Sequence, residues 1–143
     1  AAPTWANIIK LETEVAQDNA DNGALAYITN TKVRGKLKST LRTATYGDIP
    51  VWGEGATPLN GYPAYVTNQV SSTLTKGSSS VASAIFFGNW SDLILGMWGE
   101  MDMLVDPYTF SSSGAVRIVA FQDVDFAVRH PESFAAMLDA LTA

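Results

Sequence analysis

The hydrophobic pattern near the N-terminus predicts a helix followed by a strand. In TWANIIKLETEVAQ, which begins at Thr4, apolar residues recur at the spacing of one helix face, and Thr4 is suited to cap this helix. Asp21, Asn22 and Gly23 then supply turn chemistry. The next run, ALAYITN, is short and apolar, so it predicts a buried strand that ends at Asn30.

The segment VRGKLKSTLR predicts a second helix. Val33, Leu37 and Leu41 fall on one face of that helix, whereas Gly35 weakens it by about 1 kcal/mol relative to alanine. Five basic residues gather between Lys32 and Arg42. Such a cluster suits contact with an acidic partner, but a solvated helix face is the simpler interpretation and the one we favour.

The middle of the chain predicts loops around one strand. Glycine and proline are so frequent in residues 44–63 that they exclude regular structure over most of this segment. Long loops in compact domains are commonly functional, so this loop is a candidate contact surface. The segment AYVTNQV alternates between apolar and polar residues and predicts a strand, and the Ser/Thr-rich STLTKGSSSVAS predicts an exposed connection.

Strand-like runs dominate the remainder. AIFFGNW, LILGMW and MDMLVDPY predict strands, the last two separated by a short hairpin-type link at Gly99 and Glu100. AVRIVAFQDVDFAVRH predicts the longest strand of the chain. In the final segment, HPESFAAMLDALTA, Pro131 suits a first helical turn and an apolar stripe follows, so we expect a C-terminal helix. Helices and strands in this order predict an α+β fold.

Composition narrows the class of protein. The chain has 143 residues, of which 47% are hydrophobic and 16% charged, as in one ordinary globular domain. A net charge of -5 with nine Lys and Arg argues against a free-standing nucleic-acid binder. Without cysteine there is no disulfide or thiolate site, which is compatible with a reducing cytosol. No apolar run has the length of a membrane span, and no signal peptide pattern opens the chain.

Few residues are suited to catalysis or metal binding. His130 has no recognisable nucleophile and orienting group beside it, and with Ser133 it is expected to cap a helix start. Asp102 and Asp106 lack a His or Cys to complete a metal site. Glu100 and Asp102 would suit glycoside hydrolysis only at a separation that the sequence does not establish. We therefore predict no catalytic, cofactor-binding or metal-binding residues.

Two further motifs have structural interpretations. The glycines of WGEGATPLNG do not follow the GxxxxGK[ST] order of a phosphate-binding loop. The aromatic residues Phe86, Phe87, Trp90 and Trp98 are expected to fill a core or a subunit contact rather than to form a ligand cage.

The order of several motifs resembles a known family. Asn60–Val70 shows a glycine-hydrophobic-proline entry into a strand and a threonine-asparagine pair, and Gly88–Asp92 ends a strand with glycine and polar residues. The tripeptide Asp-Pro-Tyr follows at Asp106–Tyr108, and a final strand leads into Pro131–Phe134. Together these segments resemble the C-terminal half of the major capsid proteins of tailed bacteriophages or prophages, the Hong Kong ninety-seven fold.

The resemblance implies an axial domain plus part of a peripheral domain. Residues 1–45 would be the peripheral part, with Trp5–Asn19 as spine helix, followed by the strand and second helix. Residues 46–143 would be axial-domain loops and strands that return to the peripheral domain and a C-terminal helix. The loop Tyr46–Gly61 would lie near the axial tip or an intersubunit edge, and Gly88–Tyr108 would be shell-building strands.

The family's N-terminal arm and extended loop hairpin should precede Ala1. Because neither is present in this sequence, which also begins without Met, we expect a fragment.

The function implied by the resemblance is structural. We expect a head subunit that self-associates into pentamers and hexamers of an icosahedral shell around phage DNA, with no catalysis, no cofactor, no sequence-specific nucleic-acid recognition and no membrane. Scaffold or portal proteins are further expected partners, and the expected locations are the virion and, during assembly, the host cytoplasm. The alternatives are an encapsulin-like nanocompartment shell and a small hydrolase that uses Asp92, Glu100 or Asp102 with His130.

Overall fold

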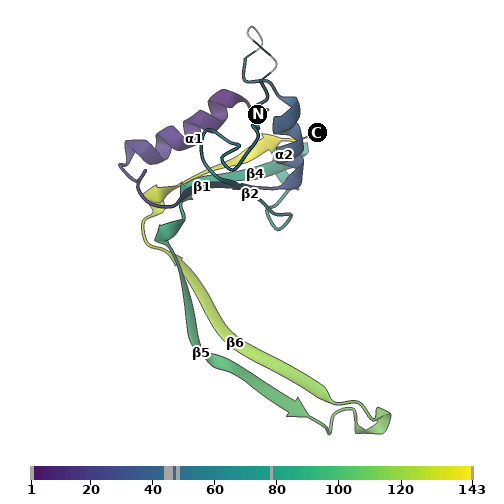
Figure 1. The fold of residues 1–143 in the computed structure, drawn as a ribbon. Coiled ribbons are helices and arrows are strands. Elements are labelled where there is room, and N and C mark those ends of the chain that lie inside the picture. The colour runs from purple at the N-terminus through teal and green to yellow at the C-terminus, as the bar shows by residue number, and fades with distance from the viewer. Residues whose placement is uncertain (1, 44–46, 48, 78, 143) are drawn as a thin grey trace. The chain divides into compact units, whose positions relative to one another are not determined.

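The chain divides into two compact units. The computed structural model describes residues 2–43, 47, 49–77 and 79–142. The core unit comprises Ala1–Asp92 and His130–Ala143, and the hairpin unit comprises Leu93–Arg129 (Figure 1). Composition alone predicts one globular domain, but the buried hydrophobic residues in the described ranges all belong to the core unit. The assignment of residues 1–45 and 46–143 to capsid domains concerns places in a shell and stays a prediction.

Two helices of the core unit form where the sequence predicts them. α1 (Trp5–Gln17) begins after Thr4, whose side chain accepts a hydrogen bond from the Asn7 N–H at 3.4 Å. β1 (Leu25–Thr29) follows, and α2 (Thr31–Ser39) is capped by Asn30, whose Oδ1 accepts from the Val33 N–H at 2.9 Å. The prediction for Leu41 is wrong: this residue lies beyond α2, is exposed, and forms an isolated bridge with Pro50.

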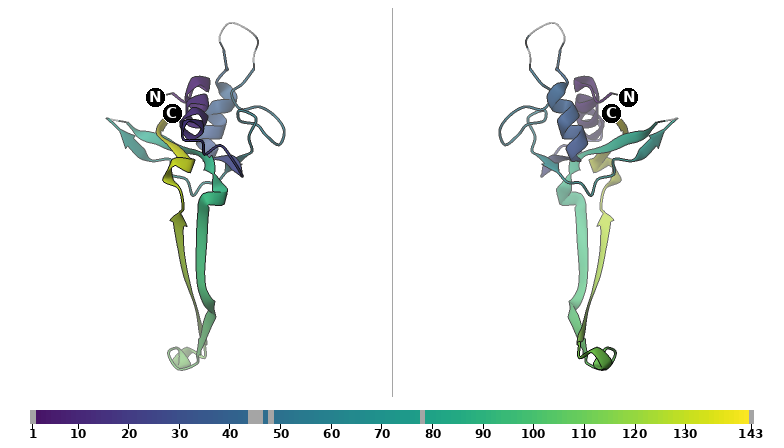
Figure 2. Two further views of the ribbon diagram at one scale, coloured as in Figure 1. Left: turned by 90° about the vertical axis from the view of Figure 1, so that its left-hand side faces the viewer. Right: turned by 90° about the vertical axis from the view of Figure 1, so that its right-hand side faces the viewer.

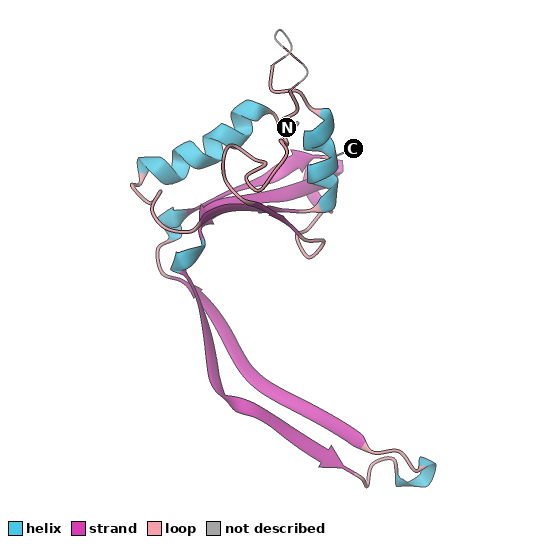
Figure 3. Cartoon of the chain, in the orientation of Figure 1, coloured by secondary structure: helices cyan, strands magenta, loops and turns pink. Residues whose placement is uncertain are grey.

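A five-stranded mixed sheet supports both helices. β2 (Ala64–Val66) runs parallel to β1, and β4 (Ser79–Asn89) pairs antiparallel with β1, β3 (Leu74–Lys76) and β7 (Phe134–Leu141). Figure 3 shows α1 and α2 over the same face of this sheet.

The core lies between the helices and the sheet. Tyr27 and Phe87 face each other across β1 and β4 with ring centroids 4.4 Å apart. The other fully buried large apolar side chains are Ile8, Val15, Val33, Leu37, Val51, Leu59 and Ile85. Two of them, Val51 and Leu59, come from the glycine-rich loop. The described part of that loop is irregular as predicted, but it is also anchored in the core.

The predicted C-terminal helix is wrong. Pro131–Ser133 forms a single 3-10 turn, and Phe134–Leu141 then forms β7. Its sequence FAAMLDAL has an apolar stripe at helical spacing, but the same residues also fit a strand beside β4. Tertiary pairing overrides the weak intrinsic preference for helix.

The residues around β3 also differ from expectation. The Ser/Thr-rich segment predicted as an exposed connection forms β3 and the start of β4, because Ser and Thr are tolerated in strands when a partner is present. Conversely, the strand predicted for AYVTNQV is limited to Ala64–Val66.

The hairpin unit is one long antiparallel pair. β5 (Leu93–Asp106) and β6 (Arg117–Val128) run side by side in both views of Figure 2 and are joined through a short 3-10 turn, Ser111–Ser113. The break predicted at Gly99 and Glu100 is a bulge within β5, where Gly99 has a φ of +73° and the register shifts. β5, with 14 residues, is therefore longer than β6, with 12.

Candidate functional site

Asp92 and Ser133 belong to a cluster of hydrogen-bonded polar side chains. The Ser133 hydroxyl donates to Asp92 Oδ2 at 2.7 Å, and Asn89 Nδ2 donates to the same oxygen at 3.2 Å. Asn89 Oδ1 accepts from the Ala24 N–H at 3.1 Å, so the group ties β4 to the turn before β1. His130 borders the same open cavity of about 340 Å³. In a catalytic triad the histidine lies between the serine and the acid. Here the Ser133 hydroxyl instead donates its hydrogen bond directly to the Asp92 carboxylate, so these residues do not form a triad.

The candidate hydrolase residues do not fall in one unit. Asp92 and His130 belong to the core unit, whereas Glu100 and Asp102 belong to the hairpin unit. Among the described residues, no group of at least three His, Cys, Asp or Glu side chains is placed to hold a metal ion. No helix in the described ranges is both long and apolar enough to cross a membrane.

One face of the hairpin unit is almost entirely apolar. Paired residues on neighbouring strands point to the same face, and successive residues alternate between faces. The register therefore gathers Leu93, Leu95, Met97, Met103, Val105, Ile118, Ala120, Gln122, Val124, Phe126 and Val128 on one side, which we call the apolar face. Gln122 is its one polar member, and Gln122 Nε2 lies 3.8 Å from Met97 Sδ. Each large apolar side chain of this face is at least 37% exposed.

The opposite side, which we call the acidic face, has a different chemistry. Its members are Ile94, Gly96, Trp98, Asp102, Leu104, Asp106, Arg117, Val119, Phe121, Asp123, Asp125 and Ala127. The Trp98 ring packs over Gly96, because a Cβ built there would lie 3.0 Å from the ring. Trp98 is 60% exposed, so its predicted role as a contact residue fits better than a place in the core.

The tip of the hairpin is organised by Asp106. Its carboxylate accepts hydrogen bonds from the Thr109 hydroxyl and from the Tyr108 N–H, the latter at 2.9 Å. The Thr109 side chain is the main reason that the pKa of Asp106 lies below its ordinary value. This cluster closes a turn and has the form of an Asx turn rather than a catalytic pair.

A second polar cluster fixes the glycine-rich loop to α1. Tyr62 Oη donates to Glu12 Oε1 at 2.9 Å, and Asn60 Nδ2 donates to the other carboxylate oxygen. The hydrogen bond to Glu12 raises the pKa of Tyr62, and burial raises the pKa of Tyr27 beside it. These phenols stay neutral at physiological pH and serve packing.

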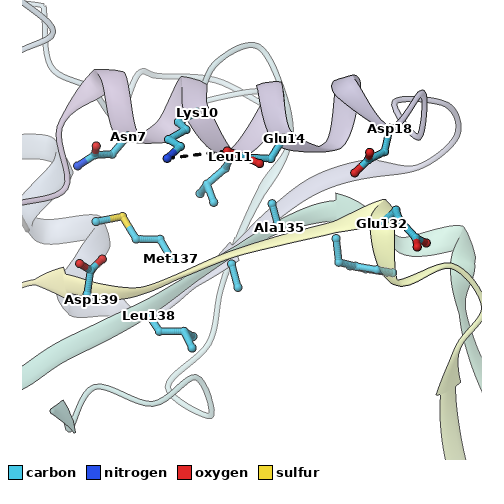
Figure 4. A pocket seen from close by; sticks show the side chains of 12 residues that line it. Asn7, Lys10, Leu11, Glu14, Asp18, Glu132, Ala135, Met137, Leu138 and Asp139 are labelled. Carbon is cyan, nitrogen blue, oxygen red and sulfur yellow. Dashed lines mark ion pairs between the residues drawn. The ribbon is translucent and has the colours of Figure 1, made fainter. Parts of the chain in front are cut away.

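An open groove of about 490 Å³ runs between α1 and β7 (Figure 4). Leu11, Ala135 and Met137 lie along it, and Lys10 and Glu14 on the α1 rim form an ion pair at 3.8 Å. Among the described residues β7 pairs only with β4, so its other edge borders the groove. Sequence reasoning missed this groove because it assigned β7 to a helix.

Comparison with known proteins identifies relatives among virus shells. A model of the phage capsid family matches residues 1–138. The major capsid protein of Halomonas phage phiHAP-1 is 32% identical over 130 residues, which are 91% of this chain and 19% of the relative. The chain thus spans less than a fifth of that relative's length.

Solved structures share the fold at low sequence identity. A chain from Mycobacterium phage Che8 is similar with a TM-score of 0.64 at 16% identity, covering 95% of this chain and 50% of that one. The capsid of an empty GTA particle gives 0.61 at 19% identity, covering 88% and 42%. The holo-SrpI encapsulin complex from Synechococcus elongatus PCC 7942 gives 0.62 at 16% identity, covering 99% and 50%. These structures support the predicted α+β fold of capsid type.

Proposed function

The chain belongs to the phage capsid family, and from this premise we propose that it is part of a major capsid subunit that self-associates into an icosahedral shell. Its work is then structural: the formation of repeated non-covalent contacts around phage DNA. The shared family and the relative from phage phiHAP-1 support this role.

The observation that carries the proposal is the apolar face of the hairpin unit. Two-stranded hairpins are at best marginally stable in water and need a third strand or a packed element to become stable. Here the large apolar residues of one face, from Leu93 to Val128, are exposed along both strands. Extended apolar surfaces of this kind are typical of protein contacts. Further parts of the subunit and neighbouring copies would cover the apolar face.

Partners and location follow from the same role. Copies of the subunit would surround one another as pentamers and hexamers, which are closed rings of heterologous contacts. Scaffold and portal proteins are further proposed partners. The proposed locations are the virion and, while shells assemble, the host cytoplasm.

An encapsulin-like nanocompartment shell is the second candidate. The SrpI encapsulin structure has a TM-score of 0.62 to this chain, close to the value for the phage structures. The fold alone therefore does not separate the two. The phage relative at 32% identity favours the phage shell.

The test compares two neighbouring residues of β6 on opposite faces. Phe126→Asn and Asp125→Asn would be introduced into the whole capsid subunit that carries this chain, and particles would be counted by electron microscopy and sedimentation. We expect Phe126→Asn to abolish shells because it places an amide in the buried contact, and Asp125→Asn to retain them. Equal particle yields from the two variants would contradict the role proposed for the apolar face.

A further inference from the structure

The outer face of α2 is basic. Lys32, Arg34 and Lys38 are exposed, and among the described residues their side chains form no ion pair. Arg42, in contrast, is used internally, because its guanidinium lies 4.3 Å from the centroid of the Trp5 ring and its Nε donates to the Pro50 carbonyl. Within the basic cluster, Arg42 is therefore an internal anchor, whereas Lys32, Arg34 and Lys38 form no ion pair with the described residues.

Gly35 lies within this outer face, and no contact among the described residues requires glycine at this position. It is in the interior of a helix, where glycine is less favourable than alanine. Its φ is not positive, and a Cβ built on it would meet no atom within 4 Å. A bare backbone at such a place permits close approach by another molecule. The glycine thus marks the outer face of α2 as a contact surface.

The groove between α1 and β7 has the opposite charge. Glu14, Asp18 and Glu132 line it and are exposed, and they outnumber Lys10, which lies on the same rim and pairs with Glu14. Asp18 is the C-cap of α1, and the last turn of that helix carries no basic residue. The helix dipole places partial negative charge at the same end of α1. The acidic side chains add to this negative potential, so a cation bound there would be stabilised.

We propose that the outer face of α2 docks on the α1–β7 groove of a second copy of this chain. This inference rests on the proposed self-association and assigns one contact to it. Charge complementarity selects the partner, since the basic face and the acidic groove are both present in every copy. With only three outward cations on α2, a chain of net charge -5 is poorly suited to hold nucleic acid instead.

The contact is heterologous, because it joins two different surfaces. α2 and the groove are both parts of the core unit, so each copy presents one surface and receives at the other. Repetition of such a contact closes into a ring when the rotation between copies permits it. The contact would therefore act between neighbours around a capsomer.

Charge reversal with rescue tests the contact directly. The measurement is sedimentation velocity of this 143-residue chain over a concentration series at low and moderate salt. We expect Lys32→Glu with Lys38→Glu to weaken association by about tenfold or more, and Glu14→Lys with Glu132→Lys to do the same. An equimolar mixture of the two reversed proteins should associate again. Failure of the mixture to associate would overturn the proposal.

Gly35→Ala separates a contact role from a structural one. In the isolated chain this substitution should raise the melting temperature, because alanine favours the helix and finds open space. It should nevertheless weaken association, because a methyl group then stands in the contact. A variant that is more stable and associates as well as the original chain would contradict close approach at Gly35.

Zero-length carbodiimide cross-linking distinguishes the outcomes. Cross-links between Lys32 or Lys38 and Glu14, Asp18 or Glu132 of another copy would support the proposal. Cross-links that join these lysines only to carboxylates of the hairpin unit, such as Asp102, Asp123 or Asp125, would overturn it but leave self-association intact. A chain that stays monomeric, or whose α2 face instead binds a duplex DNA oligonucleotide, would also overturn it. The Phe126 experiment on whole subunits would still decide the shell function.

Discussion

The core unit and the hairpin unit are both rich in apolar strands, yet their surroundings differ completely. In the core unit, β4 is covered by two helices, and Phe87 is 0% exposed. In the hairpin unit, Phe126 has a similar strand context and is 71% exposed. Strand-forming sequence therefore does not imply a core within the same chain. The difference separates residues that stabilise this chain from residues for which we propose a contact with other parts of the subunit or with other copies.

The largest expected difference between the two units is in the stability lost when one phenylalanine in each is truncated. Phe87→Ala should destabilise the chain by about 3–5 kcal/mol, because it leaves a cavity among Tyr27, Tyr62 and the helices. Phe126→Ala should change the unfolding free energy by less than about 0.5 kcal/mol. Urea denaturation followed by circular dichroism gives both values. Similar losses for the two variants would show that the hairpin is covered within the chain.

A second substitution tests how tightly β7 is packed on β4. A Cβ on Gly88 would lie 2.5 Å from both the Ser133 carbonyl oxygen and Phe134 Cδ1, and the carbonyl is backbone that cannot move alone. Gly88→Ala should therefore cost about 1–3 kcal/mol by overpacking. Thermal unfolding measures the loss. An unchanged melting temperature would mean that β7 is not held in this register.

Trp98→Asp tests whether the Trp98 ring is exposed on the acidic face or buried in a core. The substitution would lower the unfolding free energy by a few kcal/mol if the ring lay in a core, but the ring is 60% exposed. We expect a change within about 0.5 kcal/mol for the isolated chain, together with reduced shell yield for the whole subunit. Stability is measured by urea denaturation, and particle yield by sedimentation. A large loss of stability in the isolated chain would place Trp98 in a buried site instead.

The smallest expected effect is at the hairpin tip. The pKa of Asp106 is lowered mainly by the Thr109 hydroxyl. A lowered pKa means that this carboxylate favours the folded turn above its ordinary pKa of 3.8 and loses that contribution as the pH falls through the folded value. Thr109→Val should raise the pKa of Asp106 towards 3.8, as measured by NMR titration. An unshifted titration curve would remove the hydroxyl as the cause.

The sequence by itself determined the local features that depend on neighbouring residues. Helical spacing and the capping side chains of Thr4 and Asn30 were sufficient for α1 and α2. Glycine and proline density marked the irregular loop, and the alternation of residues 117–128 marked β6. The ordered motifs from Asn60 to Phe134 indicated the family. Each of these signals acts within a few positions of the chain.

Tertiary structure decided what depends on residues far apart. The segment FAAMLDAL fits a helix or a strand, and its pairing with β4, more than 45 positions away, selects the strand. The bulge at Gly99 keeps β5 continuous where the sequence predicts a break, because β6 supplies partners on both sides of it. The apolar face and the α1–β7 groove likewise exist only through pairing and packing. The free energy of such contacts belongs to pairs of segments, so neither segment shows it alone.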